Sequence, residues 1–221
     1  MKESIGILAT KKLAHNQKQF LLNANFKVID EDFIHIQPIA FEVKNTNDIL
    51  IFTSQNAVLN VLTHKEEFIH KPTICVGEKT KNILLENGFS IICFQPEAAE
   101  LIRSIEKEYM NNSFTFFCGA SRLNTIPNFL REKSIKHQII EVYKTIETPV
   151  KINSKMDGIL FFSPSGVSSY IKEHKITNEI CFCIGTTTAT AIKPFAENII
   201  IANQPSVENV IIQCIHYFKS T

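Results

Sequence analysis

Apolar runs of strand length alternate along most of this chain with segments in which apolar residues recur at helical spacing. Short apolar runs are typical of strands buried on both faces, and amphipathic segments between them are typical of covering helices. From residue 49 onward the predicted strands are 49–53, 73–76, 90–94, 114–118, 138–143, 158–162, 179–184 and 198–202. The predicted helices are 56–62, 79–86, 98–109, 123–133, 167–174, 188–195 and 207–218. This alternation predicts an α/β protein with mainly parallel, helix-covered sheets.

One part of the pattern occurs twice. FTSQNAV at residues 52–58 returns as FFSPSGV at residues 161–167, and CVGEKT at residues 75–80 returns as CIGTTT at residues 183–188. Ser163 follows Ser54 by 109 positions, and Gly185 follows Gly77 by 108 positions. This agreement predicts two similar lobes built on a duplicated plan, with a ligand cleft between them.

The second half of the chain matches the first only if the N-terminal elements join it. These are a predicted strand at 5–9, a helix at 15–25, a strand at 27–29 and an extended stretch through residue 38. We therefore expect a discontinuous first lobe, residues 1–34 plus 149–221, and an inserted second lobe, residues 37–146. Connectors near residues 33–37 and 143–149 would form a two-strand hinge. The polar segment 144–150, which contains Pro149, is the clearest linker signal.

Composition indicates an ordinary soluble protein, with 44% hydrophobic residues, 20% charged residues and a net charge of +1. No segment approaches the ~20 apolar residues that a membrane span needs, and no cleavable signal pattern opens the chain, so we expect a cytoplasmic protein. The lysines are scattered rather than clustered, so they do not indicate a nucleic-acid-binding surface.

The six cysteines lie mostly in predicted strands and are expected to be buried thiols. Because Cys181 and Cys183 form an isolated C-x-C pair, no metal site is predicted.

Small polar residues follow the predicted strands where ligands usually bind in α/β sheets, at the carboxyl ends. Ser54, Asn56, Ser163 and Ser165 are candidate helix N-caps, and Gly77 and Gly185 would let the backbone approach a ligand closely. Any one of the serines could serve only as a cap. Four matched loops that face one cleft would together present donors to several carboxylates or phosphates.

Two further side chains lie at strand ends of the second lobe. Tyr143 ends the last predicted strand and is a neutral proton donor at physiological pH that could protonate a departing hydroxyl. It could equally be a structural plug at the lobe interface. Arg122, shortly after Gly119, could pair with a carboxylate or be a solvated arginine at a helix start. Walker, dinucleotide-binding and G-x-S-x-G patterns are missing from the sequence.

Five motifs in order resemble those of the uroporphyrinogen-III synthase family. They are F-T-S-x-N-A-V at 52–58, the V-G loop at 76–80, V-Y-x-T at 142–145, F-S-P-S-G at 162–166 and I-G-x-T-T-A at 184–189. The resemblance covers nearly the full length and implies a two-lobe α/β fold with a discontinuous first lobe and a two-strand connector. It implies no metal or organic cofactor. Gln55 and Thr186 depart from the family pattern, because many members have proline there.

The resemblance implies a lyase that closes the linear tetrapyrrole hydroxymethylbilane into uroporphyrinogen III, with loss of water and inversion of ring D through a spiro-pyrrolenine intermediate. Uncatalysed closure gives uroporphyrinogen I. Tyr143 matches the tyrosine proposed to assist departure of the hydroxyl. The candidate substrate-binding residues are Thr53, Ser54, Asn56, Gly77, Thr80, Gly119, Arg122, Ser163, Ser165, Gly166, Thr186, Thr187 and Thr188.

The implied partner is therefore a small molecule, the linear tetrapyrrole, with neither nucleic acid nor membrane involved. The resemblance also allows a transient contact with the upstream deaminase, and we expect a monomer. The alternative is a non-catalytic two-lobe binding protein that closes on a small polyanionic ligand. A flavodoxin-like or nucleotide-dependent enzyme would need phosphate-binding fingerprints that the sequence lacks.

Overall fold

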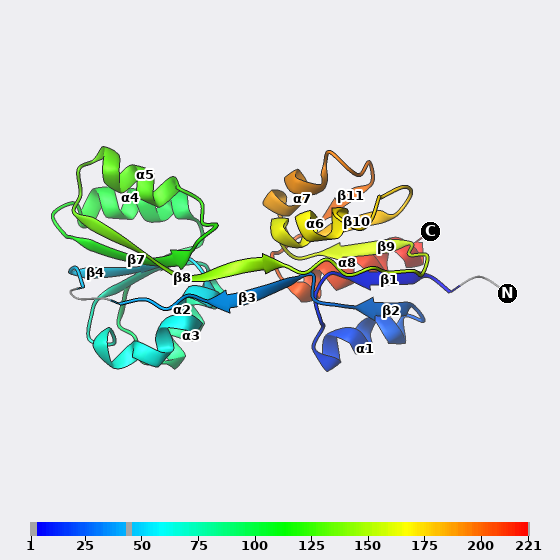
Figure 1. Ribbon diagram of the computed structural model, residues 1–221, viewed down its shortest axis with the longest axis horizontal. Helices are drawn as coiled ribbons and strands as arrows, with labels where there is room; N and C mark the ends of the chain where they lie inside the picture. The colour runs from blue at the N-terminus through cyan, green and yellow to red at the C-terminus, as the bar shows by residue number, and fades with distance from the viewer. Residues whose placement is uncertain (1–3, 43–45, 221) are drawn as a thin grey trace. The chain divides into compact units, whose positions relative to one another are not determined.

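The chain forms two compact units in a computed structural model that describes residues 4–42 and 46–220 (Figure 1). Unit 1 comprises residues 1–35 and 146–221, and unit 2 comprises residues 36–145. Residues 1–3, 43–45 and 221, which belong to the predicted lobes, lie outside the described residues. The strands β3 (Ile34–Pro38) and β8 (His137–Glu147) carry the chain across the boundary between the units.

Unit 1 is built around a five-stranded sheet in the order β11-β10-β9-β1-β2, in which all neighbouring strands are parallel. Its elements are β1 (Gly6–Ala9), α1 (His15–Asn23), β2 (Lys27–Asp30), β9 (Gly158–Phe161), α6 (Pro164–Ile171), β10 (Ile180–Cys183), α7 (Thr186–Ile192), β11 (Ile199–Ile201) and α8 (Val207–Ser220). The start of the chain thus supplies two strands of a sheet that the end of the chain completes.

Side chains of the unit 1 strands alternate between two apolar layers because successive strand residues point to opposite faces. Ile7 and Ala9 of β1 pack in the layer covered by α1 and α8, whereas Leu8 packs in the layer covered by α6 and α7. Since both faces of the sheet are covered, its inner strands need residues that can be buried at every position. β1 and β9 are accordingly buried along their whole lengths.

Unit 2 has a six-stranded sheet in the order β3-β8-β7-β4-β5-β6. Besides β3 and β8 its elements are β4 (Ile49–Phe52), α2 (Gln55–Val61), a 3-10 helix η1 (Leu62–Glu67), β5 (Thr73–Val76), α3 (Glu78–Glu86), β6 (Ile91–Gln95), α4 (Ala98–Glu108), β7 (Phe114–Gly119) and α5 (Thr125–Glu132). The helices α2 and α3 cover one face, and α4 and α5 cover the other. The order β6-β5-β4-β7-β8 repeats the order β11-β10-β9-β1-β2 of unit 1.

The predicted fold class is confirmed, since the structure has two mainly parallel, helix-covered sheets of which the first is discontinuous. The main difference concerns the end of β8. This strand continues to Glu147 rather than ending at Tyr143, so most of the predicted linker at 144–150 is strand. The polar side chains of Lys144, Thr145 and Glu147 suit a strand that is only partly buried, and they are also what makes the composition of this segment typical of a linker.

Five of the six cysteines are buried, as predicted, and Cys93 is half-buried. Burial raises the pKa of Cys75, Cys181 and Cys183 to about 12 and that of Cys118 to about 11. Thiols with so high a pKa are poor nucleophiles, so these side chains serve as small apolar groups in the core.

Candidate active site

In unit 2 the loop after β4 carries the first group of candidate site residues. Phe52 ends the strand, and the extended backbone of Ser54 makes it the N-cap of α2. Ser54 Oγ accepts a hydrogen bond from the backbone N–H of Asn56 at 3.2 Å, as a helix N-cap serine should. Thr53, Ser54 and Asn56 are all half-buried, so this predicted group lies together at the carboxyl end of β4.

Tyr143 reaches the same place from β8. Its Oη lies 3.0 Å from Ser54 Oγ, and either oxygen can be the donor of the hydrogen bond. Its carbonyl oxygen accepts a hydrogen bond of 2.9 Å from the N–H of Ala120, so the backbone is held as well. The side chain is half-buried and packs against the apolar layer beneath α2 and α3. The structure therefore brings together Tyr143 and Ser54, which lie 89 residues apart in sequence.

Gly119 makes room for the tyrosine ring. A Cβ atom at Gly119 would lie 2.6 Å from Cζ of Tyr143 and 2.8 Å from its Oη, closer than nonbonded atoms approach. The register between β7 and β8 shifts here, since Cys118 pairs with Glu141 but Gly119 pairs with Tyr143. Such an irregularity re-aims a side chain. Gly119 therefore supports Tyr143 through its missing side chain.

Arg122 is already paired within unit 2. Its guanidinium donates to Glu141 Oε1 at 2.6 Å, and the two side chains are 21% and 44% exposed. Glu141 was not singled out in the sequence because a strand residue gives no local sign of a partner 19 positions away. For Arg122 to bind a substrate carboxylate, this ion pair would have to be exchanged for a new one.

The loop after β5 contains Gly77 in a backbone conformation that explains why a glycine occurs there. Gly77 has φ +88° and ψ 133°, a backbone conformation that side-chain-bearing residues rarely adopt. Thr80, in the first turn of α3, is only 4% exposed. Gly77 is half-buried, its N–H donates to the carbonyl of Gln95 at 3.0 Å and its carbonyl accepts from the N–H of Lys81 at 3.1 Å. Neither its backbone nor the packed side chain of Thr80 is therefore free to bind a ligand as the structure stands.

The equivalent loops of unit 1 form a second polar group. Ser163 is the N-cap of α6, and its Oγ accepts from the N–H of Gly166 at 3.0 Å and lies 3.0 Å from Ser165 Oγ. Thr10, which follows β1, donates to the carbonyl of Leu160 at 2.9 Å. A Cβ atom at Gly166 would approach the hydroxyls of Ser163 and Thr10 at 3.3 and 3.5 Å. Thr10 was missed in the sequence, although it too follows a strand.

The loop after β10 is more open. Gly185 has φ −173°, which any residue can adopt, and an added Cβ atom would meet nothing within 4 Å. Thr186 and Thr187 are exposed, whereas Thr188 is 1% exposed. Thr186 and Thr187 are therefore the threonines of this loop whose hydroxyls can reach a ligand without repacking.

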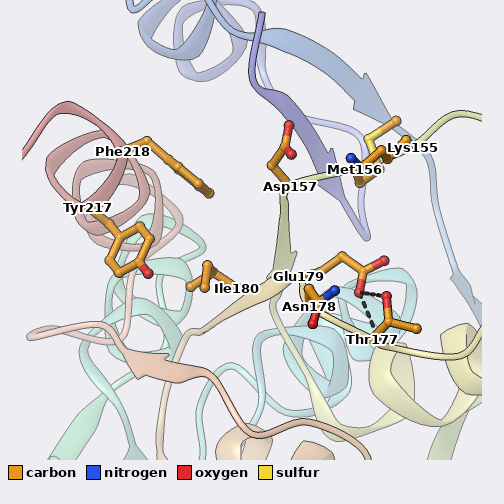
Figure 2. Close-up of a pocket in the computed structure, with 9 residues that line it drawn as sticks. All are labelled: Lys155, Met156, Asp157, Thr177, Asn178, Glu179, Ile180, Tyr217 and Phe218. Carbon is orange, nitrogen blue, oxygen red and sulfur yellow. Dashed lines mark hydrogen bonds between the residues drawn. The ribbon is translucent and has the colours of Figure 1, made fainter. Parts of the chain in front are cut away.

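Unit 1 also has a pocket of about 430 Å³ away from these loops (Figure 2). It lies where β9 and β10 begin and where α8 ends, with Asp157, Glu179 and Phe218 among its lining residues. Several of its polar groups are already bonded: Glu179 accepts from Thr177, and Asp157 accepts from the N–H of Gly6. Because it opens at the amino ends of the strands, it belongs to a different edge of the sheet from the candidate loops.

Within residues 4–42 and 46–220, no three His, Cys, Asp or Glu side chains are grouped so that they could hold a metal ion. No helix in this described part of the chain combines the length and apolarity of a membrane span.

The structure thus defines a class of protein: two α/β units of matching strand order, with polar loops at the carboxyl ends of their strands. A family model described as uroporphyrinogen-III synthase HemD matches residues 19–212. This match covers most of the chain. The chain therefore belongs to the uroporphyrinogen-III synthase HemD family.

Solved structures show the same fold at low sequence identity. The uroporphyrinogen-III synthetase of Helicobacter pylori is 18% identical with a TM-score of 0.73, covering 96% of this chain and 99% of the other. A mutant uroporphyrinogen III synthase of Thermus thermophilus is 11% identical with a TM-score of 0.71, covering 99% and 100%. The wild-type Thermus protein in another crystal form has a TM-score of 0.54 at 11% identity, covering 98% and 99%. No sequence among curated proteins matches the chain.

Proposed function

We propose that this protein is a uroporphyrinogen-III synthase, a lyase that closes hydroxymethylbilane into uroporphyrinogen III with loss of water and inversion of ring D. The observation that carries the proposal is the Tyr143 hydroxyl, held 3.0 Å from Ser54 at the carboxyl end of the unit 2 sheet in a chain of this family. We further propose that units 1 and 2 are the two lobes whose boundaries the sequence predicts, and that the enzyme works in the cytoplasm as a monomer without a cofactor.

Tyr143 acts as the general acid in this proposal. The C–O bond of the hydroxymethyl group breaks, its electron pair goes to oxygen, and the Tyr143 proton completes a water molecule. The nitrogen electron pair of the same pyrrole replaces the lost bonding pair, which leaves a cationic carbon as the electrophile. Ring D then attacks this carbon through its substituted position, which gives the spiro-pyrrolenine intermediate. The bond from that position to the carbon bridge of ring C breaks, its electron pair restores the aromatic ring D, and the bridge carbon becomes a second electrophile stabilised by the ring C nitrogen. Ring D attacks this bridge carbon through its unsubstituted position, and the proton lost from that position on rearomatisation restores Tyr143. Atoms and charges balance with water as the only by-product.

The loops hold the substrate for this attack. Hydroxymethylbilane carries acetate and propionate groups, which need donors rather than a basic surface. The side chains of Thr53 and Asn56 in unit 2 supply such donors, as do those of Ser165, Thr186 and Thr187 in unit 1. Fixing a flexible chain of rings in one geometry is worth several powers of ten in rate, because the cost of ordering is met on binding.

The direct test is a coupled assay. Hydroxymethylbilane is generated in situ by its deaminase, this protein is added, and the oxidised products are separated into uroporphyrin isomers I and III. We expect isomer III to predominate. Isomer I alone, from protein shown to be folded by circular dichroism, would reject the synthase and favour a binding protein for a small polyanion.

The same assay tests the role of Tyr143. We expect Tyr143→Phe to lower kcat by about a hundredfold or more, the lower end of what general acids contribute. Tyr109→Phe is the matched control, since Tyr109 is in unit 2 and its hydroxyl only reaches the carbonyl of Ile92 at 3.5 Å. A Tyr143→Phe enzyme with full turnover would remove the general acid from the proposal.

A further inference from the structure

The hydroxyl of Ser54 lies within hydrogen-bond distance of two groups, a backbone N–H that can only donate and a tyrosine hydroxyl that can donate or accept. The N–H of Asn56 donates to Ser54 Oγ at 3.2 Å, and Tyr143 Oη lies 3.0 Å away. The amide can only donate, so it occupies a lone pair of the serine oxygen and leaves the serine hydrogen free. The remaining neighbour to which this hydrogen can be donated, among the bonds of Ser54 in the described structure, is Tyr143 Oη.

The direction of this bond matters for a tyrosine that gives up its proton. If Tyr143 donated to Ser54, its proton would be directed away from a substrate. If Ser54 donates, the Tyr143 hydrogen points elsewhere, and the serine stays in place as a donor when the tyrosine oxygen becomes negative. Hydrogen bonds to charged oxygen are shorter and about twice as strong as those between neutral groups, so this bond strengthens as the proton leaves.

We propose that Ser54 is the positioning residue of Tyr143, donating its hydroxyl hydrogen to Tyr143 Oη so that the tyrosine proton is presented to the departing hydroxyl. This inference rests on the proposed function. It assigns Ser54 to Tyr143 rather than to direct contact with a substrate carboxylate. Gly119 completes the arrangement, because the tyrosine ring lies where a side chain at that position would be.

Capping alone does not produce this arrangement. Ser163 is the equivalent N-cap in unit 1, and its Oγ lies 3.0 Å from the hydroxyl of Ser165 rather than from a tyrosine. Ser206 accepts from the N–H of Asn209 at 3.2 Å at the start of α8 and provides a cap serine outside the candidate loops. Ser206→Ala is therefore the matched control for loss of a cap hydroxyl.

The first experiment detects the hydrogen bond without relying on activity. Protein labelled with ζ-¹³C tyrosine gives one resonance for each of the four tyrosines, and Tyr143→Phe identifies the resonance of Tyr143. We expect Ser54→Ala to shift this resonance, Ser54→Thr to restore it and Ser206→Ala to leave it unchanged. An unshifted resonance in folded Ser54→Ala protein would overturn the inference.

The second experiment is a double-mutant cycle in the isomer assay. Ser54→Ala should lower kcat about 3- to 10-fold, the worth of one ordinary hydrogen bond, and change KM less than about twofold. Ser54→Thr should regain most of this loss. In a Tyr143→Phe background, Ser54→Ala should have less than about a twofold effect on kcat, because a residue that acts through Tyr143 has nothing left to act on.

The outcomes separate the inference from the function on which it rests. Equal losses of kcat in both backgrounds, from a wild type that makes isomer III, would leave the function standing and overturn the role of Ser54. A wild type that makes only isomer I would overturn the function and the catalytic role of Ser54 together. The tyrosine resonance would then decide separately whether the hydrogen bond exists.

Discussion

The two copies of the duplicated plan share their elements but differ in what their loops hold. In unit 2 the loops after β4 and β5 carry Ser54 and Gly77 as the N-caps of α2 and α3. In unit 1 the loops after β9 and β10 carry Ser163 and Gly185 as the N-caps of α6 and α7. Both serines cap helices. Only Ser54 lies within hydrogen-bond distance of a tyrosine, however, whereas Ser163 lies beside another serine.

This difference shows that the shared local sequence determines where the helix starts but not which second side chain the cap serine contacts. Capping depends on residues two or three positions away, so both copies preserve it. The second partner of the serine comes from a neighbouring strand, which is β8 in unit 2. We infer that the proton donor belongs to unit 2, whose loops also bind substrate, and that the corresponding loops of unit 1 serve substrate binding.

The largest expected effect compares Gly119 of unit 2, which lies against the Tyr143 ring, with Gly166 of unit 1, which lies against the cap serine Ser163. Gly119→Ala places Cβ 2.6 Å from the Tyr143 ring, and Gly166→Ala places Cβ 3.3 Å from a serine hydroxyl. We expect Gly119→Ala to cost about 1–3 kcal/mol of unfolding free energy, as overpacking does, together with most of the isomer III activity. Gly166→Ala should cost less. Urea unfolding of both variants checks the order, and an equal cost would show that Gly119 does not shape the tyrosine site.

The next largest effect is expected on stability, when the glycines of the loops after β5 and β10 are each replaced by alanine. Gly77→Ala forces a side chain into a backbone conformation with φ +88° and should cost about 1–3 kcal/mol. Gly185→Ala meets no atom within 4 Å and has extended backbone, so it should stay within about 0.5 kcal/mol of wild type. Thermal and urea unfolding measure both. A larger loss of stability for Gly185→Ala than for Gly77→Ala would contradict the claim that the backbone conformation requires glycine at position 77 and not at position 185.

The smallest expected difference is between the cysteines of the two copies. Cys75 and Cys183 occupy corresponding strand positions, and burial raises the pKa of each to about 12. At pH 8 only about one thiol in ten thousand would be ionised at such a pKa, so neither should react with iodoacetamide in the native state. Half-buried Cys93 should react first. Peptide mass spectrometry reads this out, and rapid labelling of Cys75 or Cys183 would contradict the shared burial.

The sequence predicts well whatever depends on neighbours along the chain. The strands at 49–53 and 158–162 are continuous apolar runs, and Ser54 and Ser163 are recognisable caps before helices, so their elements were found within a few residues. The duplicated motifs also indicated that the N-terminal strands complete the sheet of the C-terminal half. These inferences need only periodicity and capping preferences.

The sequence does not predict contacts between distant segments. Nothing local to Tyr143 or Ser54 indicates that their hydroxyls lie 3.0 Å apart, and nothing near Arg122 indicates its pairing with Glu141. The register shift that aligns Tyr143 with Gly119 depends on how β8 pairs with β7. Gly77 and Gly185 look equivalent in sequence, yet their backbone conformations differ because different residues follow and surround them.

The most direct test of the divided roles is a parallel measurement of kcat and KM for Ser54→Ala and Ser163→Ala in the isomer III assay. Both variants lose a helix cap and should lose about 1 kcal/mol of stability, so they are matched in structural cost. We predict that Ser54→Ala lowers kcat with KM nearly unchanged, whereas Ser163→Ala raises KM with kcat nearly unchanged. The same change in the same parameter for both variants would contradict the assignment of Ser54 to proton donation and of Ser163 to substrate binding.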